Sequence, residues 1–132
     1  MSKQVLDIDQ MKHLQELGVD TSKASMCYVV DDSKAYKPIL CVSGNESEYL
    51  DAISYSVPAF TLQDIIDFFP VNIDGYVLSI GKKGVAYNRY EDLETKVGKG
   101  DRELIDAAYK MLCWCIENKH IDKRHLSHET KV

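Results

Sequence analysis

Apolar residues recur every three or four positions in three stretches of the chain, which is the spacing of one helix face. These stretches predict helices over residues 7–17, 61–70 and 101–118. Asp7 with Gln10, and Thr61 with Asp64, have the three-residue spacing of a capping box, so side chains mark the first two helix starts. Gly18 indicates the end of the first helix, because glycine favours the left-handed conformation of a helix C-cap.

Short runs rich in β-branched and aromatic residues predict strands between these helices. They form two predicted hairpins, one from residues 26–30 with 38–42 and one from residues 76–80 with 85–90. The segment 46–57 has two readings, because a third strand and a helical turn over residues 48–53 both agree with its apolar positions. Residues 91–100 are mostly charged and polar and predict a loop.

This order of elements predicts an α+β fold. Two hairpins imply an antiparallel sheet, here of about four to five strands. Three helices with one apolar stripe each pack most simply on one face of that sheet. We therefore expect a single domain over residues 1–118, in the order α-ββ-α-ββ-α, followed by a polar tail over residues 119–132 that frays.

Composition places the chain among ordinary globular proteins. Apolar residues make up 45% of its 132 positions and charged residues 28%, which argues against disorder throughout. The net charge of −5 argues against a broadly basic surface of the kind that coats nucleic acid. The first residues lack the apolar core of a secretory signal, and no uncharged apolar run reaches the length of a membrane helix. We therefore expect a cytoplasmic protein with reduced thiols and no membrane partner.

The helix predicted over residues 101–118 has an apolar face that is wider than packing on one sheet requires. Its apolar positions cover an arc of about 200°, whereas packing on one sheet needs about 100°. One reading places the helix between the sheet and the first helix. The other makes Ala107, Met111 and Trp114 a surface for a second copy of the chain or for another protein, because Trp and Met are favoured in interface cores. In that reading Trp114 is partly exposed in the monomer.

The second hairpin supplies an alternative function. Its turn, Gly81-Lys82-Lys83-Gly84, resembles the loop with which KH domains clamp RNA. That loop joins two helices, whereas both flanks here predict strands, so a plain hairpin turn is favoured. Interleaved basic and aromatic side chains on a sheet can also contact nucleic acid, and the candidates here are Lys82, Lys83, Tyr87 and Arg89. A solvated edge hairpin explains the same residues.

The sequence gives no basis for a cofactor, a metal site or a catalytic residue. Cys113 and Cys115 are two positions apart, so on a helix their side chains point about 160° apart and cannot share one zinc ion. Cys115 is predicted to be core and Cys113 a surface thiol. A pair formed by His125 and His128 shares one helix face only if the tail is helical. The nucleotide-binding and hydrolase motifs are missing, so an enzyme of unknown type ranks third among the predicted functions, after an interaction module and a nucleic-acid-associated protein.

Several blocks of the chain are similar to known sequences, namely residues 6–11, 18–26, 58–66 and 104–109. They resemble a group of small uncharacterised proteins from gut bacteria and their phage-derived or mobile elements. The group has no known activity, so the resemblance carries over no functional residue. It implies a phage-linked accessory protein. The function predicted from the sequence is therefore a small non-catalytic interaction or accessory module, whose partner is a second copy or another protein.

Overall fold

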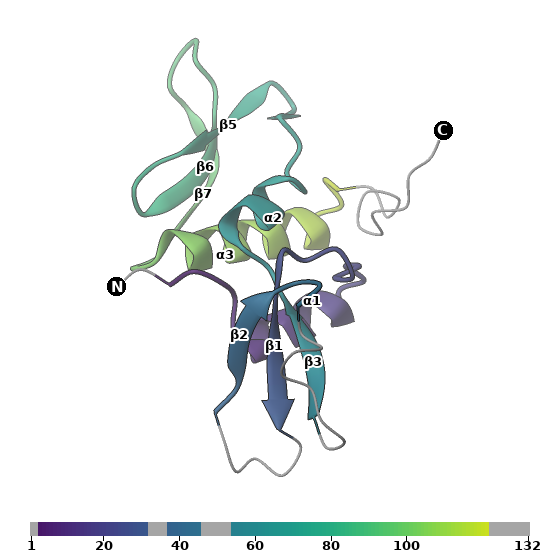
Figure 1. Cartoon of the computed structure of the whole chain (residues 1–132). Helices are drawn as coiled ribbons and strands as arrows, with labels where there is room; N and C mark the ends of the chain where they lie inside the picture. Colours follow the sequence, from purple (N-terminus) through teal and green to yellow (C-terminus); the bar gives the residue numbers. More distant parts are fainter. Residues whose placement is uncertain (1–2, 32–36, 46–53, 122–132) are drawn as a thin grey trace.

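The computed structural model describes residues 3–31, 37–45 and 54–121 (Figure 1). The described part of the chain contains three helices and seven strands. In chain order they are α1 (Ile8–Glu16), β1 (Met26–Asp31), β2 (Ile39–Val42), β3 (Ser54–Ala59), α2 (Leu62–Ile66), β4 (Asn72–Ile73), β5 (Tyr76–Ile80), β6 (Gly84–Asn88), β7 (Thr95–Gly100) and α3 (Leu104–Glu117).

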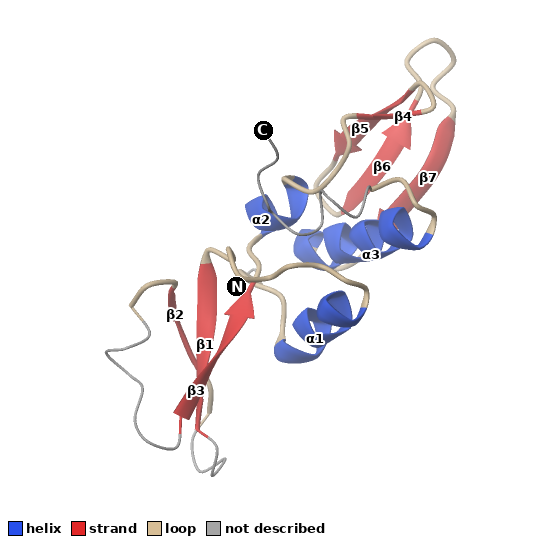
Figure 2. Cartoon of the chain, turned by 90° about the vertical axis from the view of Figure 1, so that its right-hand side faces the viewer, coloured by secondary structure: helices blue, strands red, loops and turns tan. Residues whose placement is uncertain are grey.

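The strands form two antiparallel sheets, which confirms the α+β class but not the single predicted sheet. The first sheet has the order β2-β1-β3 and the second has the order β4-β5-β6-β7. Both views show α2 and α3 between the two sheets, and Figure 2 shows α1 beside the first sheet (Figures 1 and 2). The prediction of one sheet with helices on one face is wrong because each strand pairs only within its own part of the chain, before or after α2.

Two segments differ from their predicted structure. Residues 54–57 belong to the strand β3, in agreement with one of the two readings of this segment, while residues 46–53 lie outside the described part. The predicted loop over residues 91–100 contains the edge strand β7 instead. Its sequence is TKVGKG, in which Val97 is the only apolar side chain, so hydrophobic alternation gave no sign of it. Pairing with β6 rather than burial therefore forms this strand.

The predicted helix ends are confirmed for α1 and in part for α2. Both capping boxes are present, from Asp7 to Gln10 and from Thr61 to Asp64. Gly18 has a positive φ of 97°, and the following amide of Val19 bonds back to the Leu14 carbonyl oxygen at 3.0 Å, as in a Schellman motif. Helix α2 is shorter than predicted, because after Ile66 the chain continues as a tighter turn.

A large core joins the three helices to the second sheet. Its fully buried side chains come from both ends of the chain and include Leu6, Met11, Leu14, Phe60, Ile65, Val85, Tyr87, Met111, Leu112 and Cys115. Helix α3 packs on β6 and β7 and also on α2, so its wide apolar arc is covered from more than one side. A smaller cluster of Cys27, Val29 and Cys41 lies in the first sheet. None of the helices in the described ranges is long and apolar enough to cross a membrane.

Candidate functional site

The three residues predicted as an interaction surface do not lie on one surface. Ala107 and Met111 have no exposed area, because they face the core that α3 shares with α2 and the second sheet. Trp114 is half-buried, as expected for the monomer. Of the three, only Trp114 is therefore available to a partner of the folded chain.

The end of α3 positions a second aromatic ring on Trp114. The amide of Lys119 bonds to the Ile116 carbonyl oxygen at 3.1 Å, and the amide of His120 bonds to the Cys115 carbonyl oxygen at 2.8 Å. Together these bonds form a Schellman motif in which Lys119, with φ 60°, takes the place usually held by glycine. The turn brings His120 back over the helix, where its ring stacks on the indole of Trp114 with centroids 5.0 Å apart.

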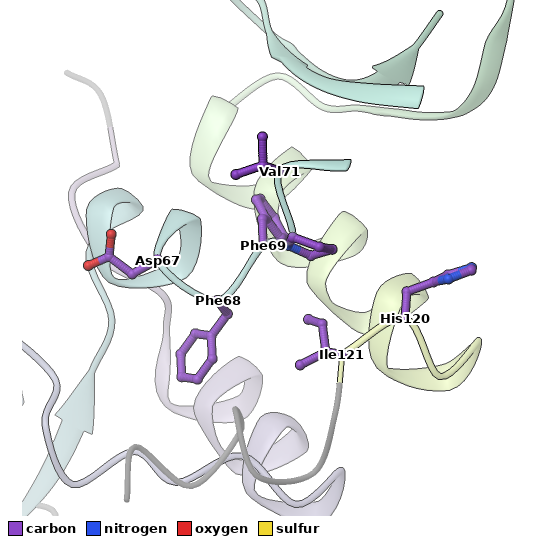
Figure 3. Close-up of a pocket in the computed structure, with 7 residues that line it drawn as sticks. Asp67, Phe68, Phe69, Val71, His120 and Ile121 are labelled. Carbon is purple, nitrogen blue, oxygen red and sulfur yellow. The ribbon is translucent and has the colours of Figure 1, made fainter. Parts of the chain in front are cut away.

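A pocket of about 430 Å³ lies next to this turn, within the size range of ligand sites. It is formed where the connection from α2 to β4 meets the residues that follow α3 (Figure 3). Most of its lining is apolar, and its residues are Asp67, Phe68, Phe69, Pro70, Val71, His120 and Ile121. Ile121 is buried, so the folded body extends beyond the predicted domain end at residue 118.

The two polar side chains of the pocket are separated by its apolar residues. Asp67 and His120 lie on opposite sides, with Phe69 and Ile121 between them (Figure 3). Val71 lines the pocket but has 76% of its area exposed, and the amide of Leu78 bonds to its carbonyl oxygen at 3.1 Å. An apolar side chain is thus held on the surface directly beside an apolar depression.

The structure separates the residues predicted to contact nucleic acid. Tyr87 is completely buried, and its hydroxyl donates to the Pro70 carbonyl oxygen at 2.7 Å. Burial raises the pKa of Tyr87 above its usual range. Its ring therefore cannot stack on a base, which removes it from the predicted contact. Strand alternation places Tyr87 and Arg89 on one face, but it does not indicate whether that face is buried. The burial of Tyr87 was therefore not predictable from the strand pattern.

Arg89 is held by acidic neighbours of its own hairpin. Its guanidinium donates to Asp92 at 2.7 Å and to Glu94, and it lies over the ring of Tyr76 with 5.0 Å to the centroid. These carboxylates offset the positive charge that a phosphate contact needs. The hydrogen bonds from Arg89 are also the main cause that lowers the pKa of Asp92 to about 2.

Lys82 and Lys83 are exposed, as predicted, but they lie beside residues that the sequence did not connect with them. They line a pocket of about 370 Å³ at the start of α3, together with Lys3, Leu62, Arg102, Glu103, Leu104 and Ile105. Lys3 donates to Asp106 at 2.7 Å, so part of its charge is already compensated. Lys3 and Arg102 come from distant parts of the chain, which is why no local pattern indicated this basic pocket.

Cys115 lies in the core, as predicted, whereas Cys113, which was predicted to be a surface thiol, is partly buried against the core. Cys115 is fully buried, and this burial raises its pKa to about 11, while burial also raises the pKa of the half-buried Cys113. Both thiols are therefore poor nucleophiles near neutral pH. Within residues 3–31, 37–45 and 54–121, no group of three His, Cys, Asp or Glu side chains is arranged to hold a metal ion. His125 and His128 lie outside the described residues.

Comparison with known proteins identifies no relative of this chain. No protein-family model, curated protein or solved structure matches the chain. The resemblance to proteins of gut bacteria and their mobile elements stays a prediction.

Proposed function

We propose that the chain is a non-catalytic protein-interaction module that forms a homodimer through the pocket beside Trp114. In this dimer Val71 of each copy enters the pocket of the other copy. The observation that carries the proposal is the position of Val71, which is 76% exposed and lines an apolar pocket of about 430 Å³. Contiguous exposed apolar surface is typical of protein-interaction sites, and Val71 is continuous with the apolar lining of the pocket.

A second copy is the partner that this surface suits best. A two-fold dimer brings the same patch of both copies together, so the patch must complement itself. The protruding Val71 and the depression lined by Phe69 and Ile121 lie side by side, which meets this requirement. A two-fold rotation places each protrusion opposite a depression of the same shape.

The charges at the pocket agree with the same arrangement. Asp67 and His120 lie on opposite sides of it (Figure 3). Rotation about a two-fold axis through the pocket exchanges the two sides, so Asp67 of one copy faces His120 of the other. A carboxylate opposite a protonated imidazole is attractive, and a carboxylate opposite a neutral one can still accept its N–H.

The lining of the pocket supports binding rather than a reaction. Five of its seven residues are Phe, Pro, Val or Ile. Acid–base catalysis needs a proton donor or acceptor within hydrogen-bond reach of the reacting group. Asp67 and His120 do not converge on one point, because the apolar residues lie between them (Figure 3).

The test is the oligomeric state of the full chain over a range of concentrations, measured by sedimentation equilibrium. We expect a monomer–dimer equilibrium that Val71→Asp shifts to the monomer. Leu93→Asp is the matched control, because Leu93 is equally exposed at 78% but lies in the β6–β7 connection. A monomer at all concentrations, or a dimer that Val71→Asp leaves unchanged, would overturn the proposal.

Contact with a nucleic-acid phosphate is the second candidate function, favoured by the basic pocket at the start of α3. Lys82, Lys83 and Arg102 are exposed around it. Filter binding of single-stranded DNA and RNA at two salt concentrations tests this function, because phosphate contacts weaken as salt rises. We expect salt-sensitive binding that the double variant Lys82→Ala, Lys83→Ala reduces. No retention at low salt would remove this candidate.

A further inference from the structure

Two cysteines of the first sheet lie directly opposite each other. Cys27 of β1 and Cys41 of β2 are register partners, and their Sγ atoms are 3.3 Å apart. Neither forms a disulfide, and their exposed fractions are 4% and 8%. The antiparallel pairing of β1 with β2 thus holds the two thiols within hydrogen-bond distance of each other, without a disulfide between them.

The backbone geometry of this pair suits a disulfide. The amide of Ser43 bonds to the Ser25 carbonyl oxygen at 3.1 Å, two positions along the same ladder. Hydrogen-bonded and non-hydrogen-bonded pairs alternate along an antiparallel ladder, so Cys27 and Cys41 also form a hydrogen-bonded pair, with Cα atoms about 5.5 Å apart. Disulfides have Cα separations of about 4.4–6.8 Å. Small rotations of the two side chains therefore suffice to join the sulfur atoms.

Cys27 also lines a small pocket that is largely polar. This pocket of about 220 Å³ is also lined by Thr21, Ser22, Ala24, Ser43, Gly44, Ser56 and Pro58. Four of these residues carry hydroxyl groups, which can donate hydrogen bonds to an oxygen atom and accept them. A molecule of the size and polarity of hydrogen peroxide fits such a lining.

We propose that Cys27 and Cys41 are an oxidation site at which hydrogen peroxide produces a reversible cross-strand disulfide. The sulfur of Cys27 attacks one oxygen of the peroxide and the O–O bond breaks. This step gives a sulfenic acid at Cys27, and the departing hydroxide leaves as water with the thiol proton. The sulfur of Cys41 then displaces the hydroxyl group from Cys27, and this group leaves as a second water with the proton of Cys41. Two thiols lose two electrons, and one peroxide is reduced to two water molecules.

The other two cysteines of the chain provide an internal comparison. Cys113 is half-buried and Cys115 fully buried, on the same helix but two positions apart. Their side chains point in different directions around α3, so they cannot form a disulfide with each other. Exposure alone favours oxidation of Cys113, whereas the proposal favours Cys27 and Cys41.

The experiment treats the full chain with a small excess of hydrogen peroxide, alkylates the remaining thiols after denaturation and maps the peptides by mass spectrometry. We expect the four thiols to fall to two, with a peptide that links Cys27 to Cys41 and is released by dithiothreitol. The cross-link should raise the melting temperature by roughly 10 °C, because it constrains the unfolded chain. Cys27→Ala and Cys41→Ala should each abolish the linked peptide, whereas Cys113→Ala should keep it.

The peptide map of the unsubstituted chain decides the proposal even if a variant fails to fold. Survival of all four thiols would overturn it, as would oxidation confined to Cys113. A map in which Cys27 carries further oxygen while Cys41 stays a free thiol would also overturn it, because the second step of the proposed reaction would then be absent.

Discussion

The indole ring of Trp114 stacks on the imidazole of His120, with the ring centroids 5.0 Å apart and the ring planes 24° apart. Trp114 belongs to α3, whereas His120 lies three residues beyond its last residue. The two rings meet because the chain turns back at Lys119, whose φ is 60°. The same turn directs His120 and Ile121 to the pocket, so this stack connects the end of α3 with the proposed dimer surface.

Substitution of His120 tests whether the stack contributes to stability and shields the indole. We expect His120→Ala to lower the free energy of unfolding by about 1 kcal/mol, which is typical of an aromatic pair. Emission from Trp114, the only tryptophan in the chain, should shift to longer wavelength because water then reaches its open face. Urea unfolding at low protein concentration and the fluorescence spectrum measure the two effects.

His13→Ala is the matched control for this prediction. His13 also contacts an aromatic ring, that of Tyr109 with centroids 6.2 Å apart, but it lies on α1 and not at the end of α3. The His13→Ala substitution should therefore leave the emission of Trp114 unchanged. An unchanged spectrum for His120→Ala as well would contradict the shielding that the stack predicts.

The turn at Lys119 predicts a stabilising substitution. A side chain with Cβ costs about 1 kcal/mol in the left-handed region, where glycine has no such cost. Lys119→Gly should therefore raise the free energy of unfolding by about 1 kcal/mol, measured by urea titration. Lys119→Ala keeps the Cβ and should give no such gain. Equal effects of the two substitutions would show that loss of the lysine charge, not backbone strain, is responsible.

The helix ends show which parts of this fold were predictable from the sequence. Capping boxes at Asp7 and Thr61, and the glycine stop at Gly18, depend on residues within five positions of each other. Such local bonds can be predicted from the sequence. The division into two sheets cannot, because it depends on strand pairing between distant segments. The strand β7 was also missed, because only one of its six residues is apolar.

The candidate site shows the same limit at the level of side chains. The partial exposure of Trp114 follows from its place at the edge of an apolar arc, which the sequence displays. Ala107 and Met111 are buried because α3 packs against α2, β6 and β7. The spacing of apolar residues within α3 does not show which other elements cover them. The pocket is lined by residues 67–71 and 120–121, which are distant in the sequence. The turn before His120 has Lys119 at the position where glycine usually marks a helix end, so the sequence did not indicate this turn.

The buried hydroxyl of Tyr87 predicts a loss of stability on its removal. It donates to the Pro70 carbonyl oxygen at 2.7 Å, and the Tyr87 side chain has no exposed area. Tyr87→Phe leaves that oxygen without this donor and should cost about 1–2 kcal/mol of unfolding free energy in urea titrations. Tyr90→Phe is the control, because Tyr90 is 76% exposed, and it should change stability by less than about 0.5 kcal/mol. Equal, small effects of both substitutions would contradict a stabilising role for the buried bond.

The Arg89–Asp92 pair predicts how the second hairpin responds to acid. Hydrogen bonds from the Arg89 guanidinium, the nearer of them 2.7 Å long, lower the pKa of Asp92 to about 2 in the folded chain, below the value of about 3.9 for an unperturbed aspartate. Because the folded-state pKa is the lower one, the pair stabilises the folded state above pH ~4 and loses this contribution as the pH falls from about 4 to about 2.

The pKa of the Asp92 carboxyl group can be followed directly by carbon NMR during an acid titration. We expect a midpoint near 2 in the unsubstituted chain and a return toward about 3.9 in Arg89→Gln, which lacks the charge. Asp101 is the internal control, because a hydrogen bond from Lys110 lowers its pKa independently of Arg89. Its midpoint should stay depressed in Arg89→Gln. An Asp92 midpoint that Arg89→Gln leaves unchanged would mean that the backbone bond from Glu94, not the guanidinium, holds the carboxylate.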